Sequence, residues 1–148
     1  MAMTGNELYP YGKEALLQKK IDVEDVVATG NLMAALVKSS YSPSYSHQFF
    51  KTITDASQQI DSSVALASSA VSVNTGTGAV TFDAVDVVFS SVTTGNTVGA
   101  IVVYVNGASP GTDDYLLALF SDDGSAISLP TNGGDITVSW NASGLFAL

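Results

Sequence analysis

The stretch VGAIVVYVNGASPGTDDYLLALF, residues 98–120, decides the fold class. It contains two apolar runs, AIVVYV and YLLALF, separated by a loop rich in Gly, Pro and Asp. Both runs have the short length and the β-branched and aromatic content that are typical of strands. Because successive side chains of a strand point to opposite faces, a run that is apolar throughout must be covered on both sides. We therefore expect two central strands, covered by an N-terminal helix or by another subunit.

The sequence around this pair also predicts strands. From Ser63 onward, apolar and polar residues alternate in segments that Gly-rich and Asn-rich turns separate. In DITVSW, for example, Ile136, Val138 and Trp140 fall on one face and Thr137 and Ser139 on the other. The predicted strand segments are residues 31–40, 63–73, 79–92, 98–107, 114–124, 135–140 and 144–148. Strands in this number without intervening helices predict a mainly β protein, an antiparallel β-sandwich of the jelly-roll-like kind.

The N-terminal region is the part with helical patterning. GKEALLQKK, residues 12–20, combines helix-forming residues with lysines at its end, which suits a short helix. A further helical turn is expected around residues 47–51. We expect one domain over residues 1–148, with an arm and short helix at 1–20 and the sandwich at 21–148.

We expect deletions at the two ends of the chain to have different effects on folding. The closing residues 144–148 should pair into the sheet and bury Leu145 and Phe146, so that their deletion unfolds the domain. Deletion of residues 1–11 should spare folding and weaken docking to a partner.

Composition narrows the class of protein. The chain has 148 residues, 46% of them apolar, which suits one domain with a real core and excludes intrinsic disorder. It contains no cysteine, so disulfides and thiolate chemistry are excluded. No apolar run reaches the roughly 20 residues of a membrane span, and residues 1–12 lack the pattern of a secretory signal. We expect a soluble protein without a membrane partner, synthesised in the cytoplasm of its host.

Charge is distributed unevenly along the chain. All five basic residues lie in the first 51 positions, where five acidic residues balance them. Nine acidic residues follow without any base, so the net charge of −9 belongs to the last two-thirds. Such a surface repels phosphate, which argues against a nucleic-acid partner.

Residues with catalytic or metal-binding chemistry are sparse. His47 is the only histidine and has no nucleophile motif beside it, so we interpret it as a half-exposed residue of an aromatic loop. NTGTGAV at 74–80 has glycines but no following lysine or helix, and we expect a hairpin turn. The acidic pairs at 113–114 and 122–123 lack the spacing of a calcium loop and are expected to be solvated turn residues, although calcium at Asp122 and Asp123 stays open. NAS at 141–143 is expected to be a turn. We expect no enzyme, no cofactor and no metal.

The order of these segments resembles a known group of proteins. KEALLQKKIDVEDVVATGNLMAALV, then SHQFF, FDAVDVVFSSVTTG, AIVVYVNG and PTNGGDITVSWNASGLFAL follow one another as in small virion proteins of tailed bacteriophages. The most specific parts are residues 82–92 and 132–140. The resemblance implies a β-sandwich that decorates the outer surface of the capsid and cements the major capsid protein, often as a trimer near local three-fold positions. It implies no catalytic residues.

Docking residues are expected among the aromatic and basic residues of the first third of the chain. Apolar contacts should come from Leu8, Tyr9, Tyr11, Leu16, Tyr41, Tyr45, Phe49 and Phe50, and steering charge from Lys13, Lys19 and Lys20. Two other classes stay open. A tail or head–tail connector protein should form rings of six or twelve, and a carbohydrate-binding module on a host-recognition fibre should expose aromatic platforms.

Overall fold

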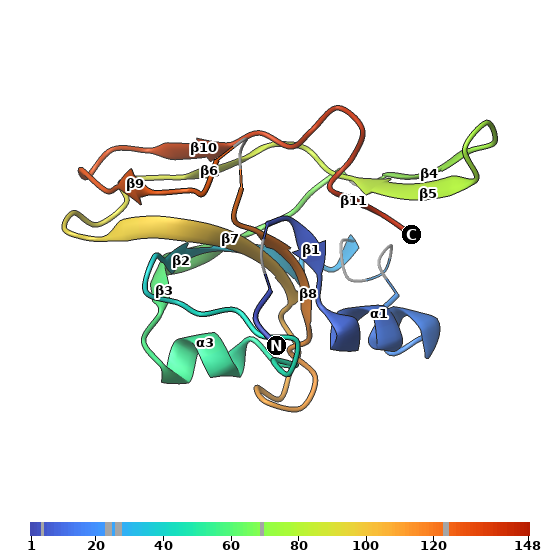
Figure 1. The fold of residues 1–148 in the computed structure, drawn as a ribbon, viewed down its shortest axis with the longest axis horizontal. Helices are drawn as coiled ribbons and strands as arrows, with labels where there is room; N and C mark the ends of the chain where they lie inside the picture. The colour runs from blue at the N-terminus through green and yellow to red at the C-terminus, as the bar shows by residue number, and fades with distance from the viewer. Residues whose placement is uncertain (4, 23–24, 26–27, 69, 123–124) are drawn as a thin grey trace.

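The computed structural model describes residues 1–3, 5–22, 25, 28–68, 70–122 and 125–148, and its strands are antiparallel (Figure 1). The mainly β class predicted from the sequence is confirmed. In chain order the elements are β1 (Glu7–Leu8), α1 (Pro10–Leu17), β2 (Leu32–Lys38), α3 (Lys51–Asp55), β3 (Gln59–Ala65), β4 (Ala70–Asn74), β5 (Ala79–Asp83), β6 (Val87–Phe89), β7 (Thr97–Val105), β8 (Leu116–Phe120), β9 (Leu129–Pro130), β10 (Ile136–Val138) and β11 (Phe146–Ala147).

Within the described residues, the strands form one large sheet and two small ones. The large sheet has the order β1-β8-β7-β2-β3, with β9 paired to one end of β7. Strand β10 pairs with β6, and β11 pairs with β5, which in turn pairs with β4. The β6–β10 pair lies over one face of the large sheet, and α3 lies under the other face (Figure 1). The two layers of the sandwich therefore differ in size: one is the large sheet, and the other is the two-stranded β6–β10 pair.

The two apolar runs that open the sequence analysis are the central strands β7 and β8, and both of their faces are covered. On one face, Val103 and Leu117 pack in a core with Phe89 of β6. On the other face, Val102 and Leu116 pack in a second core with Ile53 of α3. Covering on both sides is thus confirmed, and elements of the same chain provide it: the expected helix α1 contributes at β8, and β6, β10 and α3 cover the rest.

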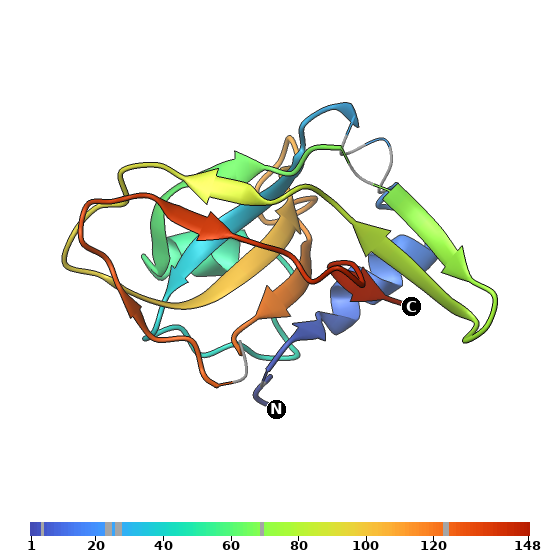
Figure 2. The same cartoon turned by 90° about the horizontal axis from the view of Figure 1, so that it is seen from above.

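Helix α1 lies against β8 at the end of the large sheet (Figure 2). Gly12 makes this approach possible, because a Cβ at that position would lie 2.5 Å from the Leu116 carbonyl oxygen. Ala15 on the same helix is buried against the first core. The helix begins at Pro10, two residues before the predicted start, and ends at Leu17. None of the helices in the described ranges is long and apolar enough to cross a membrane.

The N-terminal segment is part of the core, which differs from the expected arm. Strand β1 pairs with β8, with Glu7 opposite Leu119 and Leu8 opposite Ala118. Tyr9 is fully buried and Met3 is 3% exposed, both in the second core. Deleting residues 1–11 would open that core, so the structure gives no basis for the expectation that this truncation spares folding.

Several predicted elements have different limits. The segment 63–73 is divided between β3 and β4, and the segment 79–92 between β5 and β6. In each case the chain leaves one sheet and enters another, which a continuous apolar pattern does not reveal. The helical turn expected around 47–51 lies further along the chain, as helix α3 at Lys51–Asp55, which shares only Lys51 with the predicted range.

The closing segment pairs into a sheet and buries Leu145 as expected, whereas Phe146 is only half-buried. Phe146 pairs with Phe82 in the β11–β5 ladder, and their rings are stacked with centroids 5.1 Å apart. Leu145 is 6% exposed in the first core, and its N–H donates to the Phe82 carbonyl. These contacts hold the C-terminal segment against β5, although the Leu148 side chain is 59% exposed.

Candidate docking surface

The structure brings together the two sequence regions from which docking residues were predicted. Ala2 pairs with Ser44, and the Tyr45 N–H donates to the Met1 carbonyl. The Tyr45 hydroxyl donates to the Glu7 carboxylate at 3.2 Å. Residues 1–3 and 7–9 are therefore joined to residues 41–45 by hydrogen bonds.

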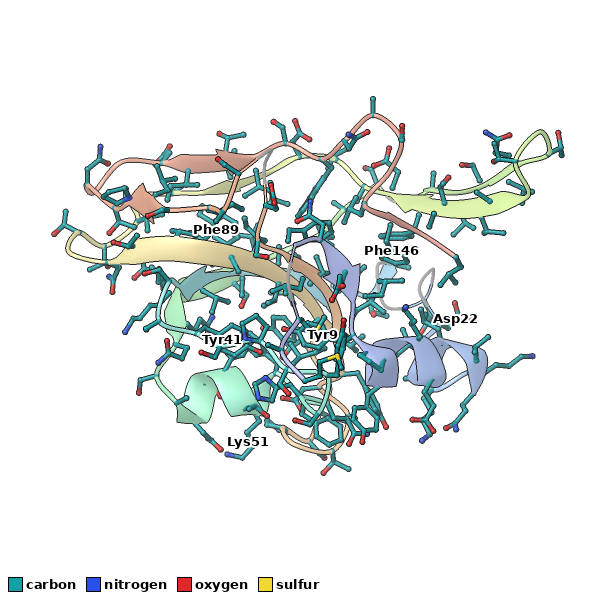
Figure 3. All side chains as sticks on the ribbon, in the orientation of Figure 1. Tyr9, Asp22, Tyr41, Lys51, Phe89 and Phe146 are labelled. Atoms are coloured by element: carbon teal, nitrogen blue, oxygen red, sulfur yellow. The ribbon has the colours of Figure 1, made fainter. Side chains whose placement is uncertain are left out.

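Two of the predicted docking residues lie inside the protein. Tyr9 is fully buried, and Phe50 is 6% exposed with its ring stacked on Tyr104 at a centroid distance of 3.6 Å. These side chains stabilise the second core, so neither is available to a partner in this conformation. Figure 3 shows Tyr9 and Tyr41 beneath the large sheet, facing the same interior region.

The phenols of this region are bonded to each other. The Tyr9 hydroxyl lies 3.1 Å from that of Tyr41, which lies 2.8 Å from Nδ1 of His47. Burial raises the pKa of both Tyr9 and Tyr41 above the ordinary value for a phenol. Burial lowers the pKa of His47, so the imidazole is neutral at pH 7 and its Nδ1 can accept a hydrogen bond from the Tyr41 hydroxyl.

Tyr45 and Phe49 are half-buried at the margin of the same structure. The hydrogen bond to Glu7 is the main reason why the pKa of Tyr45 is raised. Phe49 packs on Tyr115 with ring centroids 5.1 Å apart. Only parts of these rings reach the surface.

Helix α1 and the residues after it carry the accessible members of the predicted set. Tyr11 is 37% exposed, and Leu16 is half-buried against the first core. Lys13, Lys19 and Lys20 are exposed. Each of the other two lysines has a partner among the described residues: Lys38 Nζ donates to the Ser57 carbonyl, and Lys51 pairs with Asp55 at 2.6 Å.

A groove of ≈ 650 Å³ lies between this N-terminal region and the C-terminal strand. It joins three predicted residues, Leu8, Lys13 and Tyr45, to residues of the closing segment. Its lining consists of Asn6, Glu7, Leu8, Pro10, Lys13, Tyr45, Ala118, Leu119, Phe120, Leu145, Phe146, Ala147 and Leu148. Sequence reasoning missed Phe146 as a surface candidate, because its apolar character assigned it to the core, and it gave Leu148 no role at the surface.

The acidic pair at 113–114 lies in the loop between β7 and β8, but the expectation that both side chains are solvated is wrong for Asp114. Asp114 is 4% exposed and accepts N–H groups of Lys51 and Gly111, so its carboxylate fixes the start of α3 to the β7–β8 loop. Asp113 accepts the Ser109 N–H at 2.8 Å.

The pair at 122–123 is only partly accessible to description, because Asp123 lies outside the described residues. The backbone N–H of Asp122 donates to Asn6 Oδ1 at 3.2 Å. Within the described ranges, no three metal-ligating side chains come together.

The two turns predicted from asparagine-containing motifs are confirmed. Asn74 Oδ1 accepts the Gly76 N–H at 2.9 Å, and the Gly78 N–H donates to the Asn74 carbonyl at 2.7 Å. Asn141 Oδ1 accepts the Ser143 N–H at 2.8 Å.

Trp140 borders a second groove, of ≈ 840 Å³, beside β10. Its indole Nε1–H donates to the Val85 carbonyl at 3.0 Å, and its ring packs against Phe120 at 5.3 Å. Both contacts hold the ring half-buried against the first core, on the face predicted from the alternation of DITVSW.

Comparisons with protein-family models, with curated proteins and with solved structures give no match to this chain.

Proposed function

We propose that the chain is a phage virion protein that binds the outer surface of the capsid and stabilises the lattice of the major capsid protein. The observation that carries this proposal is the groove between α1 and β11, in which Leu8, Phe146 and Leu148 meet Lys13. Residues 10–20 carry three lysines against one glutamate, whereas residues 52–148 carry acidic residues and no base. The resemblance to phage decoration proteins supports the same role.

The occupant that suits the groove is an acidic, partly apolar segment of the capsid protein. Lys13 at the groove and Lys19 and Lys20 beyond α1 would attract carboxylates, while the apolar lining would bury aliphatic side chains. The acidic residues of 52–148 would stay turned away from the shell. An acidic exterior also fits the outside of a DNA-filled shell better than its inside.

The mechanism is stabilisation by linkage. A protein that binds the assembled lattice and not its dissociated subunits stabilises the lattice by about 2.7 kcal/mol per site at a concentration of 100 times Kd. Contacts repeated over the whole shell can each be modest and still stabilise the assembly. We propose three copies around a local three-fold position as the bound arrangement.

Co-sedimentation with empty capsids of the phage that encodes the chain tests the proposal. The unmodified protein should bind saturably, and the double variant Lys13→Ala, Lys20→Ala should bind about 2- to 30-fold more weakly. The double variant Lys38→Ala, Lys51→Ala removes the same charge from lysines that already have partners, and it should bind as the unmodified protein does. If both double variants lost capsid affinity equally, the effect would depend on net charge and not on position, which would contradict a docking role for this groove.

Two other functions predict different results. A tail or connector protein would fail to bind shells and would form a stable ring in isolation. A carbohydrate-binding module would retain glycans on an array, and the groove beside Trp140 would be its site.

A further inference from the structure

The hairpin formed by β4 and β5 projects from the body of the molecule (Figures 1 and 2). All five residues of β4, AVSVN, are exposed. Val71 is 48% exposed and Val73 is 65% exposed, which is unusual for β-branched residues of a strand. This chain therefore holds apolar surface away from its own core.

The two faces of the hairpin differ in chemistry. Val71 stands opposite Phe82 and Val73 opposite Val80, and Phe82 stands opposite Phe146 in the next strand. These residues share one apolar face. On the other face, the hydroxyls of Ser72 and Thr81 share a hydrogen bond of 2.7 Å. The hairpin is thus amphipathic although it covers little of the protein.

The outer edge of β4 has no strand beside it in the part of the chain that the structure describes. Strand β5 is paired on both sides, with β4 and with β11, whereas β4 is paired only with β5. Every second residue of an edge strand directs its N–H and C=O outward, where another strand can bond to them. Proteins usually protect such edges with lysine, proline or an inward charge. Residues 70–82 contain no charged residue and no proline.

We propose that β4 is a self-association site, at which a second copy of the chain adds its own β4 in antiparallel orientation. A two-fold axis at Ser72 places each Val71 opposite Val73 of the other copy and Ala70 opposite Asn74. The four exposed valines then pack together on the apolar face, and the two Ser72 side chains meet on the polar face. The pattern of β4 is complementary to itself in this register.

The self-complementary pattern of β4 selects a second copy as the occupant, and charge does not oppose the pairing at this edge. Each chain has a net charge of −9, so most surfaces of two copies repel each other. At the outer edge of β4 two copies can meet without apposing carboxylates, because residues 70–82 carry no charge and Asp83 lies one strand further in, opposite Ala70. The pairing is isologous, which closes the assembly at two copies. It concerns the free protein and does not depend on capsid binding.

Sedimentation equilibrium of the full chain tests this inference. The unmodified protein should show a monomer–dimer equilibrium, and Val73→Lys should raise its dissociation constant by about tenfold or more, because each seam would then hold two lysines. Val88→Lys is the matched control: Val88 is a strand valine, 46% exposed on β6, and the variant has the same charge. It should dimerise as the unmodified protein does.

A cross-linking experiment fixes the register. The chain has no cysteine, so Ser72→Cys introduces a single thiol. Directly opposed residues of antiparallel strands have Cα atoms about 4.5–5.5 Å apart, within the range of a disulfide. Mild oxidation should give a disulfide-linked dimer of Ser72→Cys and leave Ser90→Cys, a control at an exposed position, mostly monomeric. A monomer at all concentrations, or an oligomer that Val73→Lys leaves unchanged, would overturn the inference.

Discussion

Truncating Tyr9 to alanine should destabilise the protein far more than the same change at Tyr11. The two tyrosines stand two residues apart, but Tyr9 is fully buried in the second core and Tyr11 is 37% exposed on α1. Removing a buried aromatic ring costs about 3–5 kcal/mol, since the cavity only partly collapses. Removing a surface side chain usually changes stability by about 0.5 kcal/mol or less. Comparing Tyr9→Ala with Tyr11→Ala therefore distinguishes the effect of burial in the core from the effect of losing any tyrosine side chain.

Urea unfolding followed by the fluorescence of Trp140, the only tryptophan, measures both variants. With a slope of about 2 kcal/mol/M, Tyr9→Ala should lower the midpoint by about 2 M. Tyr9→Phe keeps the ring and loses only the hydrogen bond to Tyr41, so it should cost about 0.5–1.5 kcal/mol. If Tyr9→Ala and Tyr11→Ala shifted the midpoint equally, the N-terminal segment would not belong to the core.

Three further predictions concern other parts of the fold. Leu145→Ala should cost about 2–5 kcal/mol because Leu145 is buried, whereas Leu17→Ala, at a residue 83% exposed, should cost little; thermal unfolding of both checks the role of the closing segment. Asp114→Ala should cost about 1–3 kcal/mol, since it leaves inward N–H groups without an acceptor, and urea titration measures this. Burial lowers the pKa of His47 in the folded protein, so the unfolded chain, with a pKa of about 6.5, binds the proton more readily. The free energy of unfolding should therefore fall as the pH drops from about 7.5 to 5.5. A His47→Asn variant whose stability had the same pH dependence as the unmodified protein would contradict this.

The sequence was most informative where a pattern leaves a single physical solution. Strands β7 and β8 had to be covered on both faces because neither face is polar, and both are. The predicted alternation also holds for Ile136, Val138 and Trp140, which are all half-buried against the first core. These features depend only on neighbours along the chain.

Features that depend on distant residues could not be predicted. The break between β5 and β6 follows from the pairing of β6 with β10, about fifty residues away, and not from the residues at the break. Tyr9 and Phe50 lie among polar and aromatic residues typical of a surface loop, yet they are buried because α3 and the N-terminal segment close over the large sheet. For the candidate site, the sequence identified Leu8, Lys13 and Tyr45 but not their C-terminal neighbours Phe146 and Leu148.

The measurement that tests the account most directly is the thermal stability of empty capsids, recorded by calorimetry at increasing concentrations of the protein. A cementing role predicts that the capsid transition moves to higher temperature as the sites fill and then stops at saturation. The Lys13→Ala, Lys20→Ala variant should need more protein to reach the same shift. A capsid transition that stays at one temperature at every concentration, while the protein keeps its own fold, would contradict the account.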